Sequence, residues 1–288
     1  MNKQCFLCGS NKFHIIHKGV RDNPSLDVLK CDDCGLVRLS EIVTDDTYYV
    51  NALMRENDTE EDLSQIRTTA RPDDYRRYLF LRRLIENKTL LDFGCGAGGV
   101  LQYAQNEAKK VYGVELETTM YKELNKEGIR CFQTLEEAYS EIKGKIDVVT
   151  LFHVLEHLKD PIKILKGLKE VLSENGKIVI EVPNANDALL AVYENKCFSD
   201  FTYWESHLYL YDNITLKMLM DKAGLKVKFL TQIQRYPLSN TLYWLAKGKP
   251  GGHKIWSMLS NEILDREYEN QLVKLGIADT LMAVVEVR

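Results

Sequence analysis

From residue 89 onward, short apolar runs rich in β-branched residues alternate with longer runs in which apolar residues recur every three or four positions. The first pattern predicts strands and the second predicts helices. Strands and helices that alternate in this way build a mostly parallel sheet with helices on both faces. The sequence therefore predicts a doubly wound α/β fold around a seven-stranded sheet. The expected strands are 89–93, 110–115, 130–133, 146–152, 177–182, 226–233 and 280–287, and the expected helices include 75–85, 100–107, 118–126, 161–172 and 214–223.

Composition limits the class of protein. The 288 residues suit one such domain plus a small module, and 45% hydrophobic with 28% charged residues is typical of a globular chain. A net charge of -4 disfavours nucleic-acid binding. No apolar run approaches the roughly 18 residues that a membrane span requires, and no apolar signal segment follows Met1. We expect a cytoplasmic protein without a membrane span and without a nucleic-acid partner.

Four of the seven cysteines form two C-x-x-C pairs, Cys5 with Cys8 and Cys31 with Cys34. An odd cysteine total argues against a disulfide framework. Zinc prefers four soft ligands in a tetrahedron, and each pair supplies two thiolates from one tight turn. We therefore predict a zinc site in a ribbon over residues 1–45, and with four protein ligands it has no open position for water and is structural.

Two alternatives to this zinc site stay open: a redox dithiol, which needs only one cysteine pair, and a site in which His14 or His17 replaces a thiolate. Residues 1–45 carry six Lys/Arg and six Asp/Glu, so the ribbon lacks the basic excess of a nucleic-acid binder. We interpret it as a folding module or a substrate lid. Residues 46–72 are polar and acidic, which predicts a linker with helical pieces before a domain over 73–288.

A glycine-rich loop follows the first expected strand of the sheet. Glycines at this place allow the backbone to approach a ligand and aim helix N-terminal amides at it. Gly94, Gly96 and Gly99 satisfy the dinucleotide pattern G-x-G-x-x-G, whereas Gly94, Gly96 and Gly98 satisfy the S-adenosylmethionine pattern G-x-G-x-G. Glu115 ends the next strand about 20 residues later, where a carboxylate accepts hydrogen bonds from ribose hydroxyls. The loop and the acid indicate adenosine and leave the choice of ligand open.

The segment 147–161 decides between a dinucleotide and S-adenosylmethionine as the ligand. Its sequence is D-V-V-T-L-F-H-V-L-E-H-L-K-D-P. It resembles a signature of class I S-adenosylmethionine-dependent methyltransferases. Asp92 and the run 176–184 match the same family, and segments 207–211 and 222–225 resemble a subset that includes many small-molecule methyltransferases. The resemblance covers roughly residues 70–288. A zinc ribbon ahead of such a core is similar to sugar C-methyltransferases, which carry a further C-terminal domain.

The resemblance implies a Rossmann-like core that binds S-adenosyl-L-methionine. Its methionine half would lie against Asp92 and the glycine loop, its ribose against Glu115, and its adenine against the segment after the third strand. The implied cofactor-binding residues are Asp92, Gly94, Cys95, Gly96, Gly98, Glu115, Leu116, Thr134, Leu135, Phe152 and His153.

Segment 153–157 also matches H-x-x-E-H, a zinc pattern of metalloproteases. That chemistry requires both histidines and the glutamate on one helix, whereas His153 ends an expected strand and Pro161 begins the next helix. We therefore reject the protease interpretation. Glu156 and His157 have a structural alternative, which is to fix the loop between strand and helix.

For catalysis we predict that His153 or His207 acts as the general base, because an unperturbed imidazole titrates near pH 6.5. The alternative for each is a histidine bonded to backbone. Residues 203–205 are expected either to line the acceptor site or to belong to the core. Residues 237–276 exceed a normal connection between strands, and we interpret them as a cap over the site or a homodimer interface.

The sequence thus predicts methyl transfer to a small-molecule acceptor, for which the expectation is a sugar or a surface-polysaccharide precursor. The alternative is a noncatalytic S-adenosylmethionine-binding module that docks a partner through the zinc ribbon. A dehydrogenase ranks third, since it explains the glycines and leaves segment 147–161 unexplained.

Overall fold

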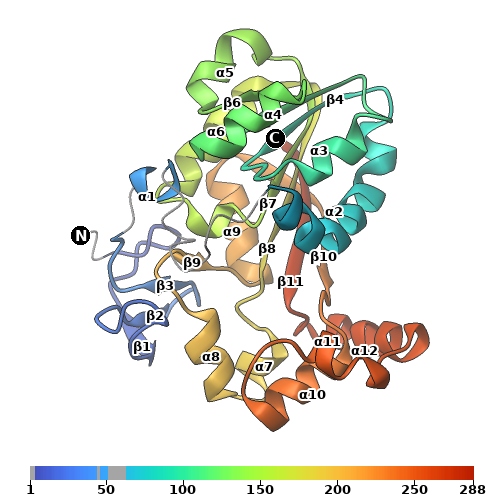
Figure 1. Cartoon of the computed structure of the whole chain (residues 1–288). Coiled ribbons are helices and arrows are strands. Elements are labelled where there is room, and N and C mark those ends of the chain that lie inside the picture. The colour runs from blue at the N-terminus through green and yellow to red at the C-terminus, as the bar shows by residue number, and fades with distance from the viewer. Residues whose placement is uncertain (1–3, 44–45, 51–62) are drawn as a thin grey trace.

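The computed structural model describes residues 4–43, 46–50 and 63–288 (Figure 1). Of the linker predicted over 46–72, positions 51–62 lie outside the described residues. What is described of it folds as the short helix α1 (Asp46–Val50) and the first part of the long helix α2 (Leu63–Ile85).

The described residues form a seven-stranded sheet, in the order β10-β11-β8-β7-β4-β5-β6. Strands β4 to β8 pair in parallel, and β11 lies antiparallel between β8 and β10. This arrangement confirms the predicted doubly wound, mostly parallel sheet. The strands are β4 (Thr89–Phe93), β5 (Lys110–Val114), β6 (Arg130–Phe132), β7 (Ile146–Phe152), β8 (Leu172–Pro183), β10 (Leu225–Ile233) and β11 (Thr280–Val287).

Helices cover both faces of the sheet because successive strand residues point to opposite sides. Leu90 packs with the helices α2, α3 (Gly99–Ala104) and α4 (Thr118–Lys126). Its neighbour Leu91 packs in the core of the other face, which is covered by α5 (Leu135–Ile142), α6 (Pro161–Val171) and α9 (Asn213–Lys222).

Helix α2 differs most from its prediction, because it begins at Leu63 rather than at residue 75 and runs through Pro72 without a break. Its first half is held from outside the helix. Arg67 Nε donates to the carbonyl oxygen of Ala97 at 2.8 Å, and its guanidinium forms an ion pair with Glu127 at 2.7 Å. Contacts with the glycine loop and with α4 therefore stabilise a segment whose own sequence is polar.

The N-terminal ribbon is joined to the larger domain by main-chain pairing. Its strands β1 (Phe13–His17), β2 (Val28–Cys31) and β3 (Val37–Leu39) are antiparallel, and β3 also pairs with β9 (Tyr209–Leu210). The buried ribbon residues belong to the same apolar core as the α5–α6–α9 face. In Figure 1 the ribbon lies at the left, beside β9.

Residues between β10 and β11 fold as α10 (Leu238–Lys247), α11 (Gly252–Ile255), the 3-10 turn η3 (Ser257–Leu259) and α12 (Glu262–Leu275). Figure 1 shows them at the lower end of the sheet, beside α7 (Ala188–Ala191) and α8 (Lys196–Thr202). Phe198 of α8 packs edge-on against Trp244 of α10, with ring centroids 5.1 Å apart. None of the described helices has the length and apolarity to cross a membrane.

Candidate functional site

The glycine loop between β4 and α3 adopts left-handed backbone angles, with φ of 74° at Gly94, 52° at Gly96 and 74° at Gly98. A Cβ atom on Gly94 would lie 2.4 Å from Val154, and one on Gly98 would lie 2.4 Å from Leu124. Around Gly96 there is no atom of the described structure within 4 Å of that position. Two glycines therefore allow close packing behind the loop, while Gly96 presents bare backbone to open space, as a bound ligand requires.

Glu115 follows β5 and turns back toward this loop. Its Oε2 accepts a hydrogen bond from the Gly96 amide at 2.7 Å, and its Oε1 accepts one from the Glu117 amide at 2.8 Å. Next to it, the carbonyl oxygen of Leu116 accepts a hydrogen bond from Gln133 Nε2 at 3.1 Å. The structure thus brings the predicted ribose acid against the predicted glycine loop.

Asp92 lies below the loop, between two strands. Its side chain is 3% exposed, and Oδ1 accepts a hydrogen bond from Thr150 Oγ1 of β7 at 2.6 Å. Burial raises the pKa of Asp92 to about 7. The carboxyl group ties β4 to β7 directly under the loop.

Four other predicted cofactor residues lie near the same strand ends. Thr134 caps α5 by accepting a hydrogen bond from the Glu137 amide, and Leu135 is buried behind it. Cys95 is buried beside Cys131. The guanidinium of Arg77 lies 5.1 Å from the ring centroid of Phe152. The sequence did not predict this contact from α2.

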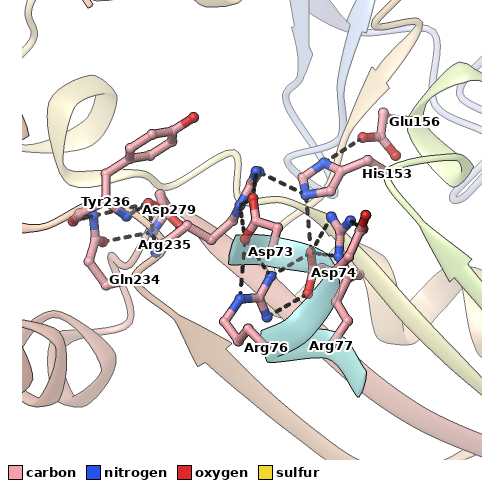
Figure 2. Close-up of polar contacts among 11 residues, drawn as sticks. Asp73, Asp74, Arg76, Arg77, His153, Glu156, Gln234, Arg235, Tyr236 and Asp279 are labelled. Atoms are coloured by element: carbon pink, nitrogen blue, oxygen red, sulfur yellow. Dashed lines mark hydrogen bonds and ion pairs between the residues drawn. The ribbon is translucent and has the colours of Figure 1, made fainter. Parts of the chain in front are cut away.

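A network of charged side chains fills the sheet edge on the other side of β4 (Figure 2). Glu181 of β8 is fully buried and forms ion pairs with Arg76 at 2.9 Å and with Arg77 at 2.8 Å. Asp73 pairs with Arg235, which follows β10. Although burial acts to raise it, the pKa of Glu181 is held well below its usual range by the hydrogen bond to His153 and by the two arginines.

His153 lies inside this network, at a positive φ of 54° directly after β7. Its Nδ1 is 3.1 Å from Glu156 Oε1, and its Nε2 is 3.0 Å from Arg235 Nη1. Its Nε2 also lies 3.3 Å from Glu181 Oε1, so the ring stands between two buried carboxyl groups, those of Glu156 and Glu181. His153 is held by side chains from other elements, not only by backbone as in the alternative interpretation.

His207 lies in the segment before β9. Its ring packs 5.2 Å from Trp204 and 5.1 Å from His157, measured between centroids. Burial lowers the pKa of His207 to about 3. In this environment the free imidazole is a weak base.

A cavity of about 350 Å³ lies at this end of the sheet, and both His153 and His207 line it. Much of the remaining wall is apolar and comes from α7, α8, α10 and α12, while the charged groups include Asp187, Asp279 and Arg235. Residues 203–205 are not among the lining residues. Tyr203 packs against His17 of the ribbon instead. The apolar wall residues include Leu189, Leu190, Phe198, Phe201, Trp244 and Leu272.

The four cysteines of the ribbon converge. Their sulfur atoms all lie within 4.8 Å of one another, with Cys5 Sγ 3.5 Å from Cys34 Sγ and Cys8 Sγ 3.6 Å from Cys31 Sγ. Four sulfurs at these separations fit the tetrahedron that a zinc ion requires, with bonds of about 2.3 Å.

Apart from His153, the sequence did not identify the residues of the edge network as site residues: Asp73, Asp74, Arg76, Arg77, Glu181, Arg235 and Asp279. The only local signal was the pattern of Asp73-Asp74 followed by Arg76-Arg77, which is common on a solvated helix face. The contacts that assemble the network join residues far apart along the chain: 105 positions separate Arg76 from Glu181, and 162 separate Asp73 from Arg235.

The family described as "Methyltransferase domain" matches residues 64–228, more than half of the chain. The chain is 27% identical over 166 residues to the ubiquinone biosynthesis O-methyltransferase of Aeromonas salmonicida, covering 53% of this chain and 69% of that protein. For the counterpart from Xanthomonas oryzae pv. oryzae, the identity is 25% over 122 residues, and the match covers 40% of this chain and 51% of the relative. The chain thus spans about half the length of the latter.

Among solved structures, the chain is similar to an S-adenosylmethionine-dependent methyltransferase from Archaeoglobus fulgidus. The TM-score is 0.51 at 20% sequence identity, and the match covers 81% of this chain and 98% of that one. At this level of identity, the similarity concerns the fold.

Proposed function

Because this chain belongs to the methyltransferase-domain family and has its fold, we propose that it transfers a methyl group from S-adenosylmethionine to a small-molecule acceptor. The observation that carries the proposal is the sheet edge itself. The open backbone at Gly96 lies on one side of it, the cavity lies on the other, and His153 follows the strand that separates them. A transfer reaction requires this arrangement of two adjoining sites.

When bound, S-adenosylmethionine supplies a methyl group that its sulfonium already activates. The chain would then have to hold the two reactants in line. The open backbone at Gly96 and the carboxylate of Glu115 would lie against the amino-acid and ribose parts. Phe152 and His153 would face the reacting end, and α2 would exclude water above the loop. We also propose as cofactor-binding the other residues that the sequence resemblance implies: Asp92, Gly94, Cys95, Gly98, Leu116, Thr134 and Leu135.

For the acceptor we propose an oxygen nucleophile on a small molecule with an apolar body. The names of the curated relatives support an oxygen acceptor. The aromatic and aliphatic wall of the cavity supports an apolar body. A sugar or polysaccharide precursor, which the sequence analysis expected, has no support among these relatives. The noncatalytic alternative has none either, since the family and the relatives are named as transferases.

His153 and His207 remain the two residues proposed to contact the acceptor oxygen and take its proton. Both line the cavity, but their surroundings differ. His153 Nε2 faces Arg235, whose guanidinium would also attract an acceptor oxygen, whereas His207 is enclosed by Trp204 and His157. The test compares turnover with melting temperature in His153→Ala and His207→Ala. Removal of a general base lowers the rate 10²–10⁴-fold, whereas removal of a histidine that only packs lowers mainly the melting temperature.

We further propose that Cys5, Cys8, Cys31 and Cys34 bind one structural zinc ion. The convergence of their sulfur atoms supports it, as do the left-handed turns at Gly9 (φ 80°) and Gly35 (φ 83°). Metal analysis of protein purified without chelator tests the proposal. The double variant Cys8→Ser/Cys34→Ser should lose this zinc, and full retention would contradict it.

Titration calorimetry with S-adenosylmethionine, S-adenosylhomocysteine and NAD tests the proposed function. We expect Glu115→Ala to weaken S-adenosylmethionine binding at least tenfold, since each hydrogen bond to a charged group contributes about 1.5–3 kcal/mol. Glu123→Ala is the matched control, because Glu123 lies on the neighbouring helix α4 and pairs only with Lys126 among the described residues. Preference for NAD, or equal affinities in both variants, would refute the assignment.

A further inference from the structure

Three metal-ligating side chains meet beside the cavity, and none of them belongs to the proposed cofactor or zinc-ribbon sites. Glu156 and His157 lie in η2 (Leu155–His157), directly after β7, and His207 comes from the segment before β9. One ligand atom from each residue lies within 4.8 Å of the others. The cluster is therefore assembled by residues about 50 positions apart.

Two polar side-chain atoms of this cluster are buried and unsatisfied. Glu156 is fully buried, and while its Oε1 accepts from His153, its Oε2 finds no hydrogen-bond partner in the described part of the chain. The same holds for the buried Nδ1 of His207. A buried polar atom without a partner costs about 1–3 kcal/mol, so two of them in one cluster indicate that something else satisfies them.

His157 is already oriented as a metal ligand. Its Nδ1 lies 2.7 Å from the carbonyl oxygen of Ser206, so this nitrogen carries the proton and Nε2 keeps its lone pair. Metal-binding histidines commonly donate their other nitrogen in this way, which fixes the ring and its tautomer.

The backbone around the cluster is equally well fixed. The Leu208 amide donates to the carbonyl oxygen of Glu156 at 2.9 Å, which joins η2 to the segment that carries His207. His207 N is itself hydrogen-bonded to Trp204 O at 3.1 Å. This backbone pairing between η2 and the segment of His207 holds the residues of the cluster together, and a cation would meet a largely preformed site.

We propose that Glu156, His157 and His207 bind one zinc ion, distinct from the zinc of the ribbon. Two imidazoles and one carboxylate suit zinc, whereas magnesium and calcium prefer all-oxygen sites. Three protein ligands leave the fourth tetrahedral position open, as in catalytic zinc sites.

The open position has a use in the proposed reaction, and this part of the inference rests on the proposed function. His207 lines the cavity, so a cation on it would lie at the cavity wall. A hydroxyl oxygen of the acceptor that binds there loses its proton more readily, and the oxyanion that attacks the methyl group is stabilised. His207 would then hold the cation, and His153 would remain to receive the proton.

The inference also gives a meaning to part of the H-x-x-E-H pattern. The two histidines of that pattern do not act together, because His153 is engaged by Arg235 and Glu156. The third ligand comes instead from His207, which lies outside the H-x-x-E-H motif and cannot be identified from its spacing.

Metal content and the spectrum of cobalt-substituted protein test the site without an acceptor. The full-length chain, loaded with zinc and dialysed without chelator, should retain two zinc ions. Glu156→Gln and His207→Asn should each retain one, and the control His253→Asn should retain two, because His253 pairs with Asn240 outside the cluster. With Co²⁺, those two cluster variants should keep the sulfur-to-cobalt charge-transfer bands and lose the weaker bands of nitrogen and oxygen coordination.

One zinc ion in the wild-type chain together with a purely thiolate cobalt spectrum would overturn the inference, as would two zinc ions in both cluster variants. The wild-type measurement stands even where a variant fails to fold, which circular dichroism detects. Calorimetry with S-adenosylmethionine on the same samples keeps the two proposals apart. Failure of the wild-type chain to bind S-adenosylmethionine would refute the proposed function, whereas the number of zinc ions tests only the second metal site.

Discussion

The two halves of the sheet edge are built in different ways. On the cofactor side, at the ends of β4 and β5, charged side chains contact the backbone of the glycine loop: Glu115 accepts a hydrogen bond from the Gly96 amide, and Arg67 donates one to the carbonyl oxygen of Ala97. On the acceptor side, at the ends of β7, β8 and β10, charged side chains from distant elements fill the surface (Figure 2).

The difference reflects what each half must recognise. A cofactor of constant shape can be bound by backbone amides that a short motif specifies. An acceptor varies from one enzyme to the next, and its pocket is made of side chains on helices that carry no common pattern. The stability of the first half should therefore depend on backbone geometry, and that of the second on charge pairing.

The largest expected effect tests the charge pairing. Glu181→Gln leaves Arg76 and Arg77 without their buried anion, and removing one partner of a buried pair costs about 3–5 kcal/mol. We expect the free energy of unfolding, measured in urea, to fall by this amount.

The matched control is Glu286→Gln on β11, whose carboxylate pairs with Lys228 at 3.1 Å on the surface. An exposed pair contributes at most about 1 kcal/mol. Equal losses in the two variants would mean that the network stabilises the acceptor side no more than a surface ion pair does.

The next effect tests the backbone side. Gly94→Ala would force a Cβ to 2.4 Å from Val154 at a φ of 74°, and Val154 has a stiff β-branched side chain, so we expect a loss of about 2–3 kcal/mol. Gly96→Ala meets open space and should cost only about 1 kcal/mol for its left-handed backbone. Gly96→Ala should nevertheless weaken S-adenosylmethionine binding, measured by calorimetry, because its methyl group enters the ligand's space. Equal stability losses in both variants would remove the distinction between packing and ligand glycines.

The same contrast explains how far the sequence could predict the molecule. Strands β7 and β11 were predicted at their observed bounds, because each is an apolar run between polar residues. The loop, Glu115 and the four cysteines were found because their spacing along the chain is set by one turn or one strand.

What the sequence could not predict depends on pairing in space. The start of α2 depends on Arg67 reaching Ala97, and the pairing of β3 with β9 joins residues more than 170 positions apart. Glu181 and Arg235 each read as an ordinary polar residue at a strand end. Their burial depends on which helix covers them in the fold, and the hydrophobic periodicity of the sequence around them does not predict that.

The smallest effect concerns Asp187, which lines the cavity and caps α7 by accepting from the Leu189 amide at 2.7 Å. Burial, with a further contribution from the neighbouring charge of Asp279, raises the pKa of Asp187 from 3.8 to about 7. Between these two pH values the folded chain keeps this proton while the unfolded chain has released it. Unfolding then releases a proton, so this group's contribution to stability falls as the pH rises from about 4 to 7 and stays low above that range.

Asp187→Asn removes that pH dependence and keeps the cap, because asparagine accepts the same hydrogen bond. We expect the variant to unfold in urea like the wild type near pH 4 and to be more stable at pH 8. A shift of one unit corresponds to about 1.4 kcal/mol, so we expect a gain of at least about 2 kcal/mol. Asp160→Asn is the control, since Asp160 caps α6 in the same manner from an exposed position. A gain at pH 8 in both variants would assign the effect to net charge, whereas a gain in Asp187→Asn alone would show that the acceptor side carries a buried carboxyl group at a cost in stability.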